Sequence, residues 1–440
     1  MKALKQVFGG KLQQYTMALA LIALVVVFNV ISGGRMLTSS NFQNLISGNA
    51  YVLILAIGMV MVIVIGQIDL SVGSVAGFVG MSVAISIAQY GFPWWAGLLL
   101  GLVLGVLVGM WHGFWLAKMG IPGFITTLAG MMIFRGLVIW MSHSISVPVP
   151  TQFSYLGAGY LPEWGPAWTG LNNSTLLLGL LALAWFAYSE INRRRQAKAR
   201  GSEIPLWVTG TRVVLIAGVI GYVTWLFGSG RPGTSFPIPG LILVVLVIIY
   251  HTITQRTRFG RHIYAVGGNK AAAALSGVNT QRTYFLVMTN MSFLAAVAGI
   301  LFIGRSTAAG PSDGTMWELD AIAAVFIGGA AVSGGIGTVV GSMVGGLVMA
   351  VLNSGLMLMG VGADQTQVIK GLVLLAAVAF DVHNKNQGKP SIIGTLMRNV
   401  GKKPDVAEVP AGTPEAQHLA GTPEVPVEGP ATDNKATIPS

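Results

Sequence analysis

Long apolar runs separated by short polar connections occupy most of the chain between residues 15 and 381. A run of about 17–25 apolar residues is long enough to cross a bilayer as an α-helix. The runs 69–88 and 319–333 are expected to be broken or re-entrant. The pattern predicts an all-α polytopic membrane protein with about twelve transmembrane helices, near residues 15–31, 44–65, 69–88, 93–117, 122–142, 175–188, 206–227, 239–251, 282–303, 319–333, 337–359 and 365–381.

Composition supports lipid as the main solvent of this chain. Of its 440 residues, 53% are hydrophobic and only 9% are charged, whereas a soluble domain has about 25% charged residues. The chain has no cysteine, which excludes disulfides and thiolate metal sites, and its six histidines show no close pairing typical of metal ligands. No P-loop, H-E-x-x-H or G-x-S-x-G motif is present. The sequence therefore contains no recognisable motif for ATP hydrolysis or proteolysis.

The positions of the basic residues predict the orientation in the membrane. Lysine and arginine collect in alternate connections, at Lys118, in 193–200, in 256–270 and after residue 383, whereas the other connections hold only Arg35, Arg231 and Arg305. Cytoplasmic loops carry this excess, so we expect an even number of spans with both termini cytoplasmic. The net charge of +11 is thus interpreted as an orientation signal, and no nucleic-acid partner is expected.

The same pattern divides the chain into three segments. Residues 1–14 are expected to form a cytoplasmic N-terminus, followed by a retained first span and not a removed signal peptide. Residues 15–382 form the transmembrane domain, in which the proline- and aromatic-rich segment 144–173 is an outer interfacial loop. Residues 383–440 are expected to be a cytoplasmic tail, largely disordered because it is rich in Pro, Glu, Ala and Thr and has no apolar period.

A basic connection, residues 256–278, contains a predicted short helix. Gly267, Gly268 and Asn269 indicate a turn, residues 270–276 are good helix formers, and Gly277 follows at a position where a left-handed conformation suits glycine. A short ordered helix in a cytoplasmic loop is typical of a surface that docks a soluble partner. The alternative is a solvated loop that only connects two spans.

Two glycine series repeat every four residues. Small residues at this spacing allow helix backbones to approach closely in lipid, and the alternative is a dimer seam or a sliding surface. The cluster of glycines at 328–337 predicts a break between two half-spans, because non-helical backbone at membrane depth must be covered by protein or water. The two series are Gly101, Gly105, Gly109 and Gly113, and Gly337, Gly341 and Gly345.

Polar residues within the apolar runs are candidates for the pathway or its gate, because a charge at the bilayer centre costs about 2.5–3.5 kcal/mol on insertion scales. Asp69 and Ser71 fall at a span start predicted to lie near the cytoplasm, where either could instead cap a helix. Arg135 and Lys370 could pair with Glu318, Asp320 or Asp364 at outer span ends. Asn290 and Asn353 are mid-span amides that could bind a solute or a neighbouring helix.

The order of motifs resembles a known family, the permease subunits of ATP-binding-cassette importers for monosaccharides. The matching stretches are IGQIDLSVGS (65–74), MGIPGFITTLAGMMIFRGL (119–137), RFGRHIYAVGGNKAAAALSGV (258–278), ELDAIAAVFIGGAAVSGGIGTVVGSMVGGLVMAVLNSGLMLMG (318–360) and QVIKGLVLLAAVAFDV (367–382). Residues 190–240 depart from the common pattern by a basic loop and an extra helical pair, 206–227 and 239–251, which looks like the xylose and multiple-sugar branch.

The resemblance implies a homodimer in the bacterial inner membrane with the pathway between its two copies. Two separate ATPase subunits would bind ATP and Mg, so no cofactor is expected in this chain, and a periplasmic sugar-binding protein would dock from outside. The loop 256–278 would carry the coupling helix that contacts the ATPase. The implied contact residues are Gly267, Gly268, Asn269, Ala272, Ala273, Leu275 and Gly277.

Two other classes of function remain open. An ion-coupled secondary transporter of a small polar solute would need intramembrane carboxylates and usually internal repeats, and neither is prominent in this sequence. A membrane enzyme would need a catalytic constellation, of which the sequence shows no sign. A secondary transporter would move solute alone on an ion gradient, whereas an importer subunit would require its ATPase.

Overall fold

The computed structural model describes residues 12–166, 169–199, 201, 205–231 and 233–386. The chain divides into two units, Met1–Gly388 and Lys389–Ser440, and every helix described here belongs to the first unit. Most of the predicted N-terminal segment 1–14 and nearly all of the predicted tail 383–440 lie outside the described residues.

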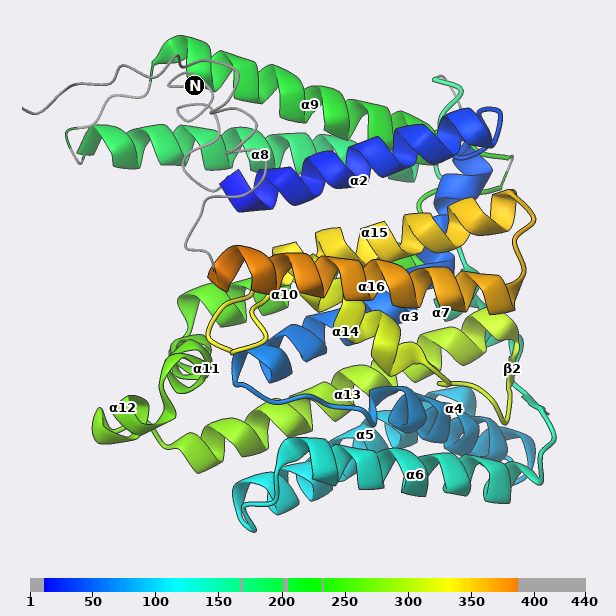
Figure 1. Ribbon diagram of the computed structural model, residues 1–440. Coiled ribbons are helices and arrows are strands. Elements are labelled where there is room, and N and C mark those ends of the chain that lie inside the picture. Colours follow the sequence, from blue (N-terminus) through cyan, green and yellow to red (C-terminus); the bar gives the residue numbers. More distant parts are fainter. Residues whose placement is uncertain (1–11, 167–168, 200, 202–204, 232, 387–440) are drawn as a thin grey trace, which may run out of the picture. The chain divides into compact units, whose positions relative to one another are not determined.

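The described part of the chain is almost entirely helical (Figure 1). Its one small sheet pairs β1 (Val147–Pro148) with β2 (Ala308–Ala309) in antiparallel register. The helices are α2 (Leu12–Ile31), α3 (Ser39–Val64), α4 (Val72–Ala88), α5 (Trp94–Ala117), α6 (Gly123–Ser142), α7 (Thr151–Ala158), α8 (Asn173–Ala199), α9 (Leu206–Gly228), α10 (Ile238–Arg256), α11 (Arg258–Gly268), α12 (Lys270–Leu275), α13 (Thr280–Ser306), α14 (Trp317–Ile327), α15 (Val339–Leu358) and α16 (Ala363–Asn386).

Each of the twelve predicted runs overlaps one helix, although the run 319–333 extends beyond the end of α14, and the expected all-helical polytopic membrane fold is confirmed. Among the described residues, eight helices are long and apolar enough to cross a membrane, namely α3, α5, α6, α8, α9, α10, α13 and α15. α4 is a shorter apolar helix, and α14 has only 11 residues. The total of twelve spans stays a prediction.

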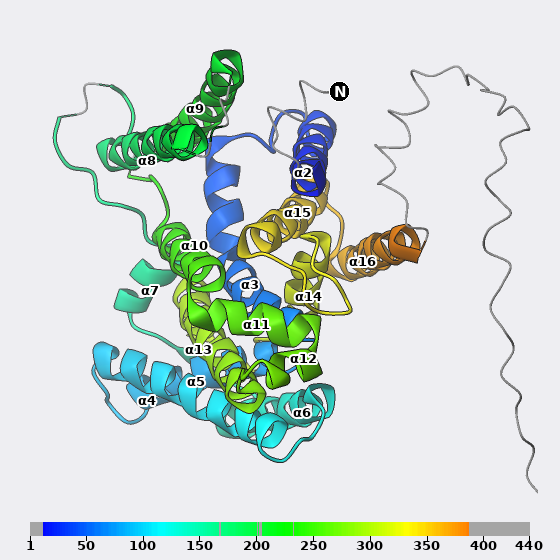
Figure 2. The same ribbon diagram turned by 90° about the vertical axis from the view of Figure 1, so that its left-hand side faces the viewer.

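Helices α3 and α13 form the centre of the bundle. Both are buried over most of their length, whereas α9 is buried over almost none of its length. Helices α4, α5 and α6 pack on one side of this centre, and α14, α15 and α16 lie on the other side (Figure 2). The peripheral helices expose many large apolar side chains, which suits surfaces that face lipid.

The glycines of α5 allow this helix to approach α13 at backbone distance. A Cβ atom added to Gly105 would lie 2.5 Å from the Cβ of Ala296, and one added to Gly109 would lie 2.5 Å from the Cα of Thr289. Gly113 faces Phe285 in the same way, and Gly101 faces Val83 and Ile300. In lipid, where apolar burial gives little driving force, such close contact supplies the attraction between helices.

Replacing Gly109 by alanine is expected to destabilise the chain by about 1–3 kcal/mol, because the new methyl group would overlap the α13 backbone. Thermal unfolding of the purified chain in detergent would measure the loss. Gly136→Ala on α6 is the matched control, since no atom lies within 4 Å of its added Cβ. Equal stability of the two variants would contradict the close packing of α5 on α13.

The second glycine series is only partly helical. Gly341 and Gly345 lie on α15, where an added Cβ would meet the carbonyl oxygens of Gly328 and Ala324 at 2.4 and 2.0 Å. Gly337 is not on this helix, contrary to the prediction, because Thr338 caps α15 by accepting a hydrogen bond from the Gly341 amide at 3.0 Å. Residues 328–338 separate α14 from α15, so the predicted break lies between these two elements.

Two segments differ from the sequence prediction. The loop predicted at 144–173 contains helix α7, which the sequence analysis missed because it is only eight residues long; its Phe153 is completely buried. The basic residues 193–198, predicted in a loop, belong to the last turns of α8. Glu190 of α8 binds Arg193 at 3.1 Å and Arg212 of α9 at 3.8 Å. Helix α8 therefore packs on α9, and the interpretation of 206–227 and 239–251 as helices added to the common family pattern stays a prediction.

Candidate functional site

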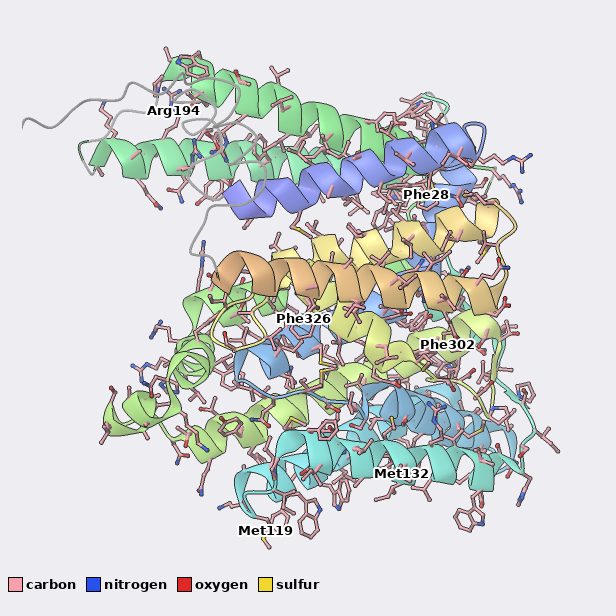
Figure 3. All side chains as sticks on the ribbon, in the orientation of Figure 1. Phe28, Met119, Met132, Arg194, Phe302 and Phe326 are labelled. Atoms are coloured by element: carbon pink, nitrogen blue, oxygen red, sulfur yellow. The ribbon has the colours of Figure 1, made fainter. Side chains whose placement is uncertain are left out.

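Helices α11 and α12 project from one end of the bundle, the end at which α3 and α5 finish and α13 begins (Figure 1). The turn between α5 and α6, marked by Met119, and the basic end of α8, marked by Arg194, lie toward the same end (Figure 3). Three of the four basic segments that the sequence assigned to one side of the membrane thus lie toward one end of the described structure.

Helix α11 lies within the basic connection 256–278 and precedes the short helix that the sequence predicted there. Thr257 caps it by accepting a hydrogen bond from the Gly260 amide at 3.2 Å. Ile263 and Val266 are buried against the bundle, and the arginines of the segment are exposed. The predicted turn at Gly267 and Gly268 is not formed, because these residues complete the last turn of α11.

Helix α12 is short but both of its ends are fixed. The Asn269 side chain accepts a hydrogen bond from the Ala272 amide at 2.9 Å. At the other end Gly277 has a φ of +83°, and its amide and that of Val278 donate to Ala274 and Ala273 at 3.0 Å. This is the Schellman arrangement, in which a left-handed residue ends the helix.

The side chains of α12 face in two directions. Ala273 is 5% exposed and packs inward, whereas Leu275 is 91% exposed. Ala272 is exposed as well. A rigid helix that holds a large apolar side chain in solvent is typical of a docking element, because such a residue gains most when a partner covers it.

Three backbone segments meet behind α11, and we call this contact the glycine junction (Val64, Tyr264, Gly267, Gly335 and Gly337). A Cβ added to Gly267 would lie 1.7 Å from the Val64 carbonyl oxygen, which accepts a hydrogen bond from the Gly335 amide at 2.8 Å. The Tyr264 hydroxyl donates to the Gly337 carbonyl at 2.7 Å. Burial raises the pKa of the Tyr264 phenol, so this donor stays protonated at neutral pH.

The glycine junction joins α11 to the end of α3 and to the break between α14 and α15. Gly334 and Gly335 both have positive φ angles, of +79° and +75°, which suit glycine. Their backbones can therefore come within contact distance of Gly267 and Gly268. Only Asn269 separates α11 from α12. A displacement of α12 would therefore move the end of α11 that contacts the break between α14 and α15.

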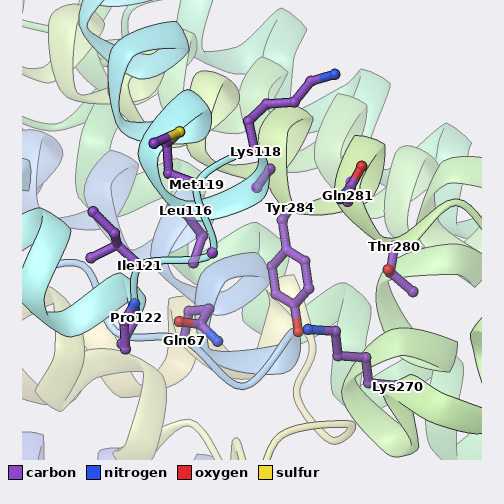
Figure 4. A pocket seen from close by; sticks show the side chains of 12 residues that line it. Gln67, Leu116, Lys118, Met119, Ile121, Pro122, Lys270, Thr280, Gln281 and Tyr284 are labelled. Carbon is purple, nitrogen blue, oxygen red and sulfur yellow. The ribbon is translucent and has the colours of Figure 1, made fainter.

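A pocket of about 560 Å³ opens beside α12, between the turn of α5 and α6 and the start of α13 (Figure 4). The Lys270 ammonium lies 5.2 Å from the centre of the Tyr284 ring, within the range of a cation–π contact. Gln67 accepts a hydrogen bond from the Gly123 amide at 3.0 Å and so links this pocket to α6. With Lys118 and Lys270 in its lining, the pocket is basic and adjoins the docking element.

Asp69 lies inside the bundle, and its predicted position near the cytoplasmic end stays a prediction. Its side chain is fully buried, and Oδ1 accepts hydrogen bonds from the Ser71 amide at 2.8 Å and hydroxyl at 2.6 Å. Ser71 precedes α4 but its side chain makes no cap bond. The next turn packs on the loop that follows α13, since a Cβ added to Gly73 would lie 2.1 Å from the Gly314 carbonyl oxygen.

Two buried groups lie near Asp69, and sequence reasoning connected neither of them with it: Glu318 was considered only as a partner of Arg135 or Lys370, and His112 was given no role. His112 of α5 is fully buried and lies close enough to Asp69 for an electrostatic interaction, and Glu318 of α14 does so as well. Among the described residues, Asp69 Oδ2, Glu318 Oε2 and both His112 nitrogens have no hydrogen-bond partner. These residues are far apart in sequence, so no local motif could have connected them.

The other pathway candidates lie in separate places. Arg135 donates to the Thr315 hydroxyl, and Lys370 binds both carboxylate oxygens of Asp320 at 3.0 Å. Asn290 accepts a hydrogen bond from Tyr250 of α10. Asn353 is half-buried on α15. The six candidates therefore do not converge on a single site, and in the part of the chain that the structure describes no three His, Cys, Asp or Glu residues could hold a metal.

Comparison with known proteins gives one family for the whole bundle. Residues 41–378 match the model described as the branched-chain amino acid transport system / permease component. The chain is 35% identical to the xylose transport system permease protein of Haemophilus influenzae, over 86% of this chain and 98% of that protein. Identity to the corresponding Escherichia coli K12 protein is 38%, over 86% and 93%.

A second sugar permease aligns over a similar length. The ribose import permease protein of Escherichia coli K12 is 30% identical over 84% of this chain and 94% of its own. No solved structure shows significant similarity to the chain. The family match includes the central helices, the glycine junction and α12. The alignments with the xylose and ribose permeases cover nearly the full length of those proteins. The chain therefore belongs to this family of multi-pass membrane permease components, and its relatives in that family include the permeases of sugar ABC importers.

Proposed function

We propose that this chain forms the translocation pathway of an ATP-driven importer for a monosaccharide, with xylose as the first candidate. It would work in the bacterial inner membrane as a pair of copies, with a separate ATPase and a periplasmic sugar-binding protein. The α11–α12 end and both termini would face the cytoplasm. The observation that carries the proposal is α12, a capped helix with Leu275 exposed, at the end of the bundle where the basic residues collect.

The glycine junction supplies a route by which the ATPase could act on the membrane helices. ATP can shift the equilibrium between two conformations only if it favours one of them, so α12 must differ in position between them. α12 adjoins α11, whose last residues touch α3 and the break before α15. A movement of α12 would thus change the packing of the central helix and of the half-helix α14.

The chain itself would bind neither ATP nor Mg, since both would belong to the partner ATPase. Residues 15–382 would be the permease domain, with 256–278 as its coupling loop. The coupling contacts would come from the residues that surround α12. They are Gly267, Gly268, Asn269, Ala272, Ala273, Leu275 and Gly277, of which Leu275 makes the largest contact and Ala273 acts through packing within the loop.

Replacing Leu275 by aspartate is expected to abolish sugar-stimulated ATP hydrolysis. The chain would be reconstituted in vesicles with its ATPase and binding protein, and hydrolysis would be followed with and without xylose, ribose or leucine. Loss of one apolar anchor costs about 2 kcal/mol or more, equivalent to about a 30-fold weaker contact. Because Leu275 is 91% exposed, the variant should fold normally.

Leu275→Met is the matched control, since it keeps an apolar side chain at the tip of α12. It should retain hydrolysis within about twofold, as expected for a conservative change at an apolar contact. Equal hydrolysis in the aspartate and methionine variants would place the ATPase contact elsewhere. If the chain moves solute on an ion gradient without any ATPase, it is a secondary transporter, and the buried groups Asp69 and Glu318 become the candidates for ion coupling.

A further inference from the structure

A second pocket, of about 250 Å³, lies between α3, α14, α15 and α16, away from α12. Its polar and aromatic lining comes from Tyr51, Thr315, Trp317, Asp320, Gln367 and Lys370. These residues belong to three helices and to the residues just before α14, and they are up to about 320 residues apart in sequence. The site depends entirely on the tertiary fold.

One wall of this pocket is aromatic and rigidly supported. The ring centres of Tyr51 and Trp317 lie 4.2 Å apart. Phe302 of α13 supports both rings from behind, with its centre 5.1 Å from that of Tyr51 and 4.5 Å from that of Trp317. Three mutually packed rings hold their orientation, and aromatic pairs of this kind are favourable beyond the area they bury.

The opposite side is an ion pair that is only partly shielded. Lys370 Nζ lies 3.0 Å from both oxygens of Asp320, and the two side chains are 19% and 14% exposed. Lysine has three donors and a carboxylate has about four acceptor positions. After the two mutual hydrogen bonds, a donor and acceptor positions remain available, beside the amide of Gln367.

The retention of these charges requires a reason. Ionisable residues in membrane spans are expensive and usually mark a solute or ion pathway, and a buried ion pair is often no more stable than apolar residues of the same size. The pair carries no net charge, which favours a neutral solute over an anion or a cation. Its unused donors and acceptors suit hydroxyl groups, which both donate and accept.

We propose that this pocket is a low-affinity monosaccharide subsite on the translocation pathway, an inference that rests on the proposed import function. A sugar ring would lay its C–H face on Trp317 and Tyr51 and direct hydroxyls to Asp320 and Lys370. Weak binding is required, because a pathway site must release its solute as readily as it accepts it. The intact ion pair would orient the hydroxyls without trapping a charged ligand.

Protection of an introduced thiol tests the subsite on the chain alone. The sequence has no cysteine, so Gln367→Cys provides a single label. Its modification by a small uncharged maleimide would be timed in detergent with D-xylose, D-ribose or sucrose. At two-thirds occupancy the rate should fall about threefold, saturably with a monosaccharide and not with sucrose, which controls for viscosity and is too large for the pocket.

Two further variants make the outcome specific. Ser312→Cys, exposed and outside the pocket lining, should react at the same rate with and without sugar. Adding Asp320→Asn with Lys370→Met to Gln367→Cys should remove the protection while the chain remains folded. A Gln367→Cys rate that monosaccharides do not change, or that they change as much as the Ser312→Cys rate, overturns the subsite.

Failure of this inference and failure of the import function are distinguishable. The thiol assay needs neither ATPase nor binding protein, so protection in a chain that supports no ATP-dependent uptake would refute only import. Conversely, the wild type could show ATP-dependent xylose uptake while sugar leaves the thiol reactivity of Gln367→Cys unchanged. That result would refute only the subsite.

Discussion

Gly267→Ala is expected to destabilise the chain by about 3–5 kcal/mol, because overpacking and a broken buried hydrogen bond add together. The added methyl group would lie 1.7 Å from the Val64 carbonyl oxygen and 2.8 Å from the Gly335 amide. Both neighbours are backbone atoms that cannot rotate away, so the hydrogen bond between them would break. Thermal unfolding in detergent would measure the loss, and sugar-stimulated ATP hydrolysis should disappear with it.

Gly268→Ala is the matched control, one residue further along the same helix. No atom lies within 4 Å of its added Cβ, and alanine is favoured over glycine inside a helix by about 0.5–1 kcal/mol. This variant should be as stable as the wild type or slightly more stable, with hydrolysis retained. If both alanine variants behave alike, the contact at Val64 does not fix α11, and the glycine junction cannot transmit movement from α12.

Lys370→Met is expected to cost about 3–5 kcal/mol, the usual penalty for leaving a shielded charge without its partner. In the wild type, Lys370 neutralises Asp320 through two hydrogen bonds of 3.0 Å. Without it the carboxylate would remain among Tyr51, Trp317 and the apolar part of α16. The fraction of monodisperse protein that survives heating would record the change.

The double variant Asp320→Asn with Lys370→Met separates charge from shape. It removes both charges, so most of the lost stability should return, since neutral replacements of an ion pair are often tolerated. Sugar protection at the neighbouring pocket should stay lost. A double variant as unstable as Lys370→Met alone would show that Lys370 stabilises the bundle by packing and not by neutralising Asp320.

Helix α14 connects the two groups of buried charges. Its first turn carries Glu318, whose carboxylate lies against Gly73 of α4, and Asp320, which pairs with Lys370 of α16. Both carboxylates lie near the helix N-terminus, where negative charge is favoured. The same short helix ends next to the break that contacts α11. Movement at α12 would therefore reach the proposed sugar subsite through one rigid element of 11 residues.

The sequence by itself determined the helices and their nature as membrane segments. Lipid provides no hydrogen-bond partners for the backbone, so a long apolar run must be helical, and each of the twelve predicted runs overlaps a helix. Local chemistry also decided the end of α12, where Gly277 adopts the left-handed conformation expected for it. The permease family followed from motifs that occur in a fixed order along the chain.

The tertiary structure alone decided which polar groups meet. Asp69, His112 and Glu318 come together, as do Tyr51, Asp320 and Lys370, because helices distant in sequence pack side by side. It also decided that α4 begins inside the bundle and that α8 pairs with α9. Hydropathy specifies which segments enter the lipid. It does not specify which helices become neighbours, because lipid is as apolar as the helices it surrounds. Close backbone packing and buried polar contacts determine the neighbours.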